Sequence, residues 1–333
     1  MRETTTVALP VRDGARSLGE TLASVRRQEL DRPVEIIVAD SGSRDGSVEI
    51  ARRHGAEVIH LPPGSFSHGG TRNLLMERSS GSHVAFLTQD AVPVGTRWLA
   101  RLLEGFKLAE GVGLVFGPYR PRPQASAPVR RELSEFFGAL APTGEPRIDR
   151  AEAGGPAPEH PDIGTFFTDA NGCVAREAWE RVPFRDVAYA EDQLLAVEMR
   201  RAGYAKVFQP DAVVVHSHDY TPVALFRRYF DEFRGLREVY GWVEPARARR
   251  TLGRVRHEMR ADIAFVRAED GAAHAALLGS LRHHVIRAAG SLIGSRADRL
   301  PPAVRRACSL ERRGSFEPFE HPQSVGAELT ANA

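Results

Sequence analysis

Residues Val34 to Leu61 read VEIIVADSGSRDGSVEIARRHGAEVIHL, and this stretch decides the fold. Residues 34–40 form a largely apolar run that ends in an aspartate, which is typical of a strand buried inside a sheet. Residues 47–55 are spaced as a short helix that ends at a glycine, and residues 56–61 form a second apolar run. A strand, a helix and a strand joined this closely predict a right-handed crossover between parallel strands.

The same alternation continues on both sides of this unit. Strands are predicted over 5–11 and 83–88, and helices over 17–28 and 70–81. We therefore expect an α/β fold whose Rossmann-like, mostly parallel sheet carries helices on both faces.

Composition places the chain among ordinary globular proteins. It has 333 residues, 42% hydrophobic and 26% charged, with a formal net charge of +2, and we expect no nucleic-acid partner. Its two cysteines, Cys173 and Cys308, are too few for a disulfide framework or a zinc cluster. The N-terminus has no apolar signal core, and no uncharged apolar run approaches the ~20 residues that span a bilayer. We therefore expect neither secretion nor a membrane span.

Two later stretches leave alternatives open. Residues 118–163 are rich in Pro, Gly and Ala and form either a mobile loop over a binding cleft or a plain linker. From Thr221 onward the chain looks helical and rich in arginine. One apolar stripe there packs on the main domain or on a second copy in a homodimer, or it lies on an anionic membrane surface. The stripe consists of Leu277, Leu278, Leu281, Val285, Ala288 and Leu292.

Acidic and histidine side chains follow the predicted strands where each one ends. Asp40 and Asp90 end two of them, and His216 and His218 end a later one, while Asp192 lies at the start of a helix. Any one of these has an ordinary structural explanation, such as starting a turn. Together they fit the rule that α/β sheets bind ligands beyond the carboxyl ends of their strands.

This set of residues predicts a particular chemistry. Asp90 and one of the two histidines suit Mg²⁺ or Mn²⁺, with the remaining ligands supplied by a nucleotide diphosphate. Asp192 is then available as a general base toward a sugar hydroxyl. The sequence therefore predicts glycosyl transfer with inversion.

The motifs also carry a family resemblance over about residues 5–230. LPVRDG, VADSGSRDGS, FSHGGTRNL, FLTQDAVP, YAEDQLLAVEMRRAGY and VVVHSHDYT follow one another in the order found in glycosyltransferase family 2. The chain resembles enzymes of that family with the GT-A fold, and within it the bacterial rhamnosyltransferases. Thr88 departs from the pattern, because it stands where the family's common Asp-x-Asp motif has its first aspartate, and this weakens the case for a metal.

The resemblance implies roles for particular residues. The catalytic pair is Asp192, the base, with Glu191, and the metal ligands are Asp90 with His216 and His218. The acceptor side is given to Asp169 and Asn171. The nucleotide and donor residues are Pro10, Arg12, Asp13, Asp40, Ser43, Arg72, Asn73, Gln89 and Asp90.

The resemblance also implies an organisation and a reaction. A GT-A catalytic domain over 1–222 has a nucleotide-sugar half, 1–100, and an acceptor half, 101–222. A helical extension over 223–313 and a flexible tail over 314–333 follow. The expected donor is dTDP-L-rhamnose and the acceptor a saccharide or a lipid-linked saccharide, with the protein in the cytoplasm or peripheral at the inner face of the membrane. The alternatives are a UDP- or GDP-sugar donor and an inactive nucleotide-sugar-binding module.

Overall fold

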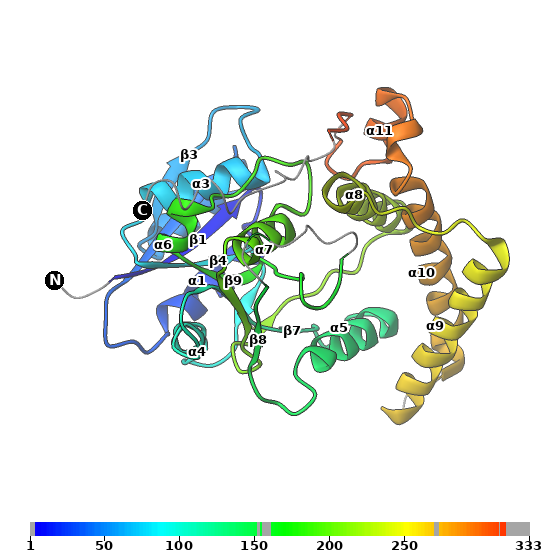
Figure 1. The fold of residues 1–333 in the computed structure, drawn as a ribbon, viewed down its shortest axis with the longest axis horizontal. Helices are drawn as coiled ribbons and strands as arrows, with labels where there is room; N and C mark the ends of the chain where they lie inside the picture. Colours follow the sequence, from blue (N-terminus) through cyan, green and yellow to red (C-terminus); the bar gives the residue numbers. More distant parts are fainter. Residues whose placement is uncertain (1–3, 152–153, 155–160, 270–272, 313, 318–333) are drawn as a thin grey trace.

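The main sheet has eight strands, and the computed structural model describes residues 4–151, 154, 161–269, 273–312 and 314–317 (Figure 1). The first four strands of the order run parallel. β9 is antiparallel to both of its neighbours, β10 is parallel to β6, and the edge strand β8 is antiparallel to β10. The α/β prediction is therefore confirmed. The strand order is β3 (Glu57–His60), β2 (Val34–Asp40), β1 (Thr5–Val11), β4 (His83–Leu87), β9 (Asn171–Ala175), β6 (Val112–Phe116), β10 (Ala205–Phe208) and β8 (Arg147–Asp149).

Helices cover both faces of this sheet. Alternate side chains of β1 point to opposite faces, so that Val7 and Leu9 enter one apolar cluster and Ala8 enters the other. The first cluster is covered by α1 (Leu18–Arg26), α2 (Ser47–Arg53) and α4 (Trp98–Gly105). The second is covered by α3 (His68–Arg78), α6 (Arg176–Arg181) and α7 (Glu191–Arg201).

A second, three-stranded sheet consists of β5 (Val92–Pro93), β11 (Val214–Val215) and β7 (Tyr119–Arg120). β11 is antiparallel to β5, with Val215 opposite Val92. This register brings the residues just before β5 beside those just after β11. It therefore brings together two chain segments that the sequence could only place at separate strand ends.

The segment predicted as a mobile loop or linker, residues 118–163, is largely ordered where it is described. It contains β7, the helix α5 (Ala127–Leu140) and β8. Residues 152–153 and 155–160 lie outside the described residues. The described part is therefore neither a mobile loop nor a plain linker, because β7 and β8 belong to the two sheets and α5 belongs to a helical layer.

The C-terminal part is helical, as predicted. In Figure 1 its helices form a layer at one side of the molecule, with α5 between the main sheet and the pair α9 and α10. α8 packs on α7 through an apolar cluster that includes Leu194, Val197, Leu236 and Val239. None of the described helices is long and apolar enough to cross a membrane. The elements are α8 (Pro222–Tyr240), α9 (Ala248–Ala268), α10 (Ala273–Gly294), the 3₁₀ helix η1 (Ala297–Arg299) and α11 (Pro302–Cys308).

The apolar stripe on α10 divides into two parts. Ala288 is buried, whereas Leu277, Leu281 and Val285 are exposed and Leu278 is 75% exposed. Packing on the main domain, one of the three expected arrangements, is therefore excluded for the first half of the stripe. The other two, a second copy and a membrane surface, stay predictions.

The predicted flexible tail from residue 314 is described only at its start. The carbonyl oxygen of Gly314 accepts a hydrogen bond from Arg305 Nε at 2.7 Å. The N–H of Glu317 donates to Glu238 Oε1 at 3.4 Å. Its first residues are thus tied to the helical extension, and residues 318–333 lie outside the description.

Candidate functional site

A cleft of about 590 Å³ opens at the carboxyl edge of β1, β2 and β4. This is the edge at which parallel α/β sheets bind ligands. Its wall includes Thr88 and, from the far end of the chain, Glu311. Five of the predicted site residues also line it: Pro10, Arg12, Arg72, Gln89 and Asp90.

The turn after β1 is fixed by side chains from neighbouring loops. Gln89 bridges the backbone of Arg12, accepting from its N–H at 2.9 Å and donating to its carbonyl at 3.1 Å. Ser43 Oγ accepts from the N–H of Asp13 at 2.9 Å, and Asp13 accepts from the N–H of Arg44 at 2.8 Å. Asp13 has a left-handed φ of 47°, which is uncommon outside glycine. Gln89, Ser43 and Asp13 therefore shape the turn, and Arg12 is an exposed residue of the turn that lines the cleft.

Asp40 at the end of β2 accepts hydrogen bonds from its own turn. The N–H groups of Gly42 and Ser43 donate to its carboxylate, each at 3.2 Å. Burial opposes ionisation, but these hydrogen bonds outweigh it and lower the pKa of Asp40. The structure thus shows the turn-forming role, and the base-reading role stays a prediction.

Asp90, His216 and His218 converge, as the sequence predicted. His216 Nδ1 lies 3.5 Å from one Asp90 oxygen, and His218 Nε2 lies 3.4 Å from the other. Their ligand atoms all lie within 4.8 Å of one another. The antiparallel pairing of β5 with β11 produces this arrangement. It places Asp90, just before β5, beside His216 and His218, just after β11.

The chemistry of this triad fits a divalent cation. His216 Nδ1 is buried and has no hydrogen-bond partner among the described residues. Burial lowers the pKa of His216 to about 4, and the charge of Asp90 offsets only part of that shift. A neutral imidazole with an unpaired nitrogen beside a carboxylate is what a Mn²⁺- or Mg²⁺-binding site requires of its ligands.

A second group of charged side chains lies where α3 meets the start of α7. Arg72 faces Asp169 with two of its nitrogens, and Nη2 donates to Oδ1 at 2.7 Å. Nη1 of the same guanidinium lies 3.0 Å from Glu191 Oε1. Arg72 and Asp169 are 4% and 5% exposed. Asp169 therefore holds Arg72 in place at the cleft, and its own access to an acceptor is small.

Glu191 and Asp192 begin α7 and have opposite pKa shifts. Burial opposes ionisation of Glu191, but the charges of His68 and Arg72 outweigh it and lower its pKa. Burial, Asp169 and Glu191 raise the pKa of Asp192 well above its ordinary value. Neighbouring carboxylates whose pKa values are driven apart are the usual sign of an acid–base site. The residue before them, Ala190, has a left-handed φ of 63°, which is backbone strain of the kind found at functional sites.

Two predicted site residues, Asn171 and Asn73, have structural hydrogen-bond partners, and their predicted roles in binding stay predictions. Asn171 is fully buried and ties β9 to α4 and to the loop at Ala212, accepting from Trp98 Nε1 at 2.8 Å. Its side chain is therefore held by these partners, away from the surface. Asn73 joins α3 to α6, accepting from Trp179 Nε1 at 2.8 Å and donating to the Phe184 carbonyl at 2.9 Å. It does not line the cleft.

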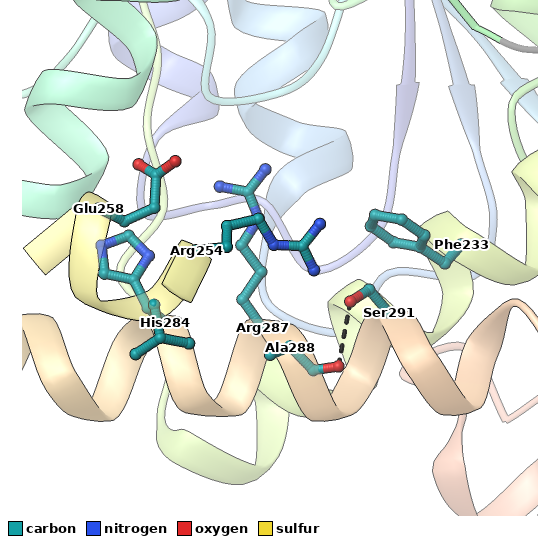
Figure 2. A pocket seen from close by; sticks show the side chains of 8 residues that line it. Phe233, Arg254, Glu258, His284, Arg287, Ala288 and Ser291 are labelled. Atoms are coloured by element: carbon teal, nitrogen blue, oxygen red, sulfur yellow. Dashed lines mark hydrogen bonds between the residues drawn. The ribbon is translucent and has the colours of Figure 1, made fainter. Parts of the chain in front are cut away.

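A second polar cluster lies in the helical layer, next to a cavity of about 70 Å³ between α8, α9 and α10 (Figure 2). Glu132, His283 and His284 bring their ligand atoms within 4.8 Å. Glu132 Oε1 already accepts from Arg287 at 2.6 Å, and His284 Nε2 lies 2.7 Å from Asp262. Because its charges are paired across α5, α9 and α10, we assign this cluster to structure.

Two residues at the cleft were not singled out from the sequence. His68 belongs to the FSHGGTRNL motif, and Glu311 belongs to the helical extension over 223–313. His68 Nε2 lies 2.7 Å from Glu311 Oε1, and His68 Nδ1 lies 3.7 Å from Glu191 Oε1. A separation of 243 residues gives no local signal of such a contact.

Comparison with known proteins gives consistent relatives. The sequence profile described as "Glycosyl transferase family 2" matches residues 6–163. The O-antigen chain rhamnosyltransferase WbaN of Salmonella anatum is 31% identical over 210 residues, 62% of this chain and 63% of that protein. The O-antigen chain rhamnosyltransferase RfbN of Salmonella typhimurium is 30% identical over 222 residues, 65% of this chain and 68% of that protein. The chain thus spans about two thirds of each relative, slightly less for WbaN.

Among solved structures, the mannosyltransferase PcManGT of Pyrobaculum calidifontis, determined with GDP-Man and Mn²⁺, matches with a TM-score of 0.54. The match covers 90% of this chain and 87% of that one at 19% sequence identity. At this identity the match supports the fold alone.

Proposed function

The chain belongs to glycosyltransferase family 2, and from this premise we propose that it transfers a sugar from a nucleotide donor with inversion. The donor is dTDP-L-rhamnose, and the acceptor is a hydroxyl of a saccharide or lipid-linked saccharide. One arrangement carries the mechanism: Glu191 and Asp192 begin α7, Arg72 lies 3.0 Å from Glu191, and the pKa values of the two carboxyls shift in opposite directions. In support, the Asp90 triad provides a second polar site with an unpaired, neutral imidazole.

Each group has one task in the proposed reaction. The oxygen of the acceptor hydroxyl attacks the anomeric carbon, its proton passes to Asp192, and the bond from that carbon to the diphosphate breaks. A raised pKa makes Asp192 a stronger base than an ordinary aspartate. Glu191 stays ionised beside Arg72, and Asp169 orients that guanidinium. The nucleoside diphosphate leaves with the electrons of the broken bond.

A divalent cation would be held by Asp90 with His216 or His218. It would supply electrostatic stabilisation of the leaving diphosphate. Arg12, exposed on the turn after β1, would add positive charge on the same side of the cleft.

The donor sugar rests on the relatives, since the two curated proteins are named rhamnosyltransferases. A UDP- or GDP-sugar donor on the same fold is the second candidate, and the fold match to a mannosyltransferase is compatible with it. A panel of dTDP-, UDP- and GDP-sugars, read by release of the nucleoside diphosphate, separates the two. Turnover of no donor with any acceptor would instead favour an inactive binding module.

Asp192→Asn tests the base. We expect turnover to fall by about 10²–10⁴-fold, because general base catalysis is lost, while nucleotide binding and thermal stability persist. In the wild type, kcat should rise with pH as Asp192 loses its proton, and this rise should be absent in the variant. Near-normal turnover of Asp192→Asn would refute the assignment. Asp186→Asn, on the nearby loop before α7, serves as a control.

A further inference from the structure

The C-terminal segment reaches back to the cleft through a turn at Ser309–Glu311. Asp231 on α8 anchors this turn, because one oxygen accepts from Ser309 Oγ at 3.1 Å and from the Leu310 N–H at 2.7 Å. Ser309 is fully buried and Asp231 is 5% exposed. The turn is therefore fixed from inside the helical layer, and it presents Glu311 to the cleft.

Glu311 meets one side chain of the catalytic domain at close range. Its Oε1 lies 2.7 Å from Nε2 of His68, the first residue of α3. The other ring nitrogen of His68 faces Glu191 at 3.7 Å. Burial alone would lower the pKa of His68, but the charges of Glu191 and Glu311 outweigh it and raise the pKa. His68 therefore lies between a cleft-wall carboxylate and the catalytic pair.

This step rests on the proposed function, in which the other residues of the cleft bind the nucleotide and its diphosphate. The turn after β1 takes the nucleoside, and Asp90 lies at the diphosphate. His68, Arg72 and Glu311 line the same cleft as Asp90. His68 and Arg72 also lie beside Glu191, so these side chains are the cleft residues next to the catalytic pair.

We propose that Glu311 and His68 form the subsite for the sugar of the donor, so that the C-terminal segment contributes directly to donor selection. A carboxylate accepts hydrogen bonds from sugar hydroxyls, and an imidazolium N–H donates to them. Arg312, the residue after Glu311, has a left-handed φ of 57°. It is one of three non-glycine residues with positive φ in the described chain. The other two are Asp13, in the turn after β1, and Ala190, which precedes Glu191.

The test compares two ligands that differ only in the sugar. Binding of dTDP-L-rhamnose and of dTDP, each with Mn²⁺, is measured by calorimetry for the wild type and for Glu311→Gln. We expect the sugar nucleotide to bind about tenfold more weakly to the variant, as one charge-assisted hydrogen bond requires, and dTDP to bind within about twofold of the wild type. Glu77→Gln, on the exposed side of the same α3 helix, should change neither value.

Asp231→Asn gives a second route, because it loosens the anchor without altering the cleft wall. It should weaken the sugar nucleotide selectively as well, with the fold checked by thermal unfolding. Equal weakening of both ligands in Glu311→Gln, or no weakening, would overturn the inference. If the wild type binds dTDP but binds no sugar nucleotide more tightly than dTDP, the proposed function is refuted instead. The two failures can therefore be told apart.

Discussion

Thr88 is the residue at which this chain departs from the family's common metal-binding motif. Its hydroxyl oxygen is buried in the wall of the cleft and has no hydrogen-bond partner among the described residues. A buried hydroxyl without a partner costs about 1–3 kcal/mol, so a bound metal or donor would offset that cost.

Thr88→Val, which keeps the shape, separates function from stability. We expect the melting temperature to stay the same or to rise, while the Mn²⁺ concentration for half-maximal activity rises about tenfold. Thr71→Val is the matched control, since Thr71 Oγ1 is also buried without a partner and lies away from the cleft. Unchanged metal dependence in Thr88→Val would deny the hydroxyl a part in binding.

The residues that could be predicted are those whose position along the chain already fixes their place in space. Asp90 follows a strand, and the ends of parallel strands meet at one edge. The roles of Asn73 and Asn171 could not be predicted in this way, because the role of a side-chain amide depends on its hydrogen-bond partners. Those partners, Trp179 and Trp98, are more than 70 residues away.

At the scale of elements, α5 and α10 are joined by a half-buried ion pair between Glu132 and Arg287. Burial opposes ionisation of Glu132, but hydrogen bonding to His283 and the charge of Arg287 lower its pKa to about 2. A carboxylate with a lowered folded-state pKa stabilises the fold above its unfolded pKa, near 4.5. That stability is lost as the pH falls from about 4.5 toward 2.

Glu132→Gln should therefore lower the free energy of unfolding by about 1.5–3 kcal/mol at pH 7, because a hydrogen bond to a charged group is lost. The difference from the wild type should shrink steadily as urea unfolding is repeated at lower pH. Glu135→Gln, one turn along α5, loses a largely exposed partner of Arg131 and should cost less than about 1 kcal/mol. A pH-independent difference for Glu132→Gln would contradict this account.

The sequence predicted none of the strands β6, β8, β9 and β10 of the main sheet, and the sequence of β10 shows one reason. β10 reads AKVF, and a lysine inside a short run argues against a buried strand. Lys206 is nevertheless fully buried, because Nζ lies 3.0 Å from Asp149 on β8 and 2.8 Å from the Phe166 carbonyl. These partners become adjacent only when the fold is complete, so the pattern of one segment does not reveal them.

At the scale of the whole molecule, both apolar and polar contacts join the helical extension to the catalytic domain. α8 packs on α7, the helix that carries Glu191 and Asp192. α5 binds α9 through Arg131 and α10 through Glu132. The sequence predicted a helical extension, but it could not show where the extension docks. We therefore expect the two parts to unfold as one cooperative unit rather than as separate domains.

Leu236→Ala, in the contact between α8 and α7, tests this coupling. Removing a buried leucine side chain typically costs about 2–5 kcal/mol, which lowers the melting temperature by several degrees. If the parts are coupled, near- and far-ultraviolet circular dichroism should follow one transition at the same lowered temperature. Leu252→Ala, on the exposed face of α9, should leave the transition in place. Two separate transitions, with only one moved by Leu236→Ala, would show that the extension folds independently of the helix that supplies the base.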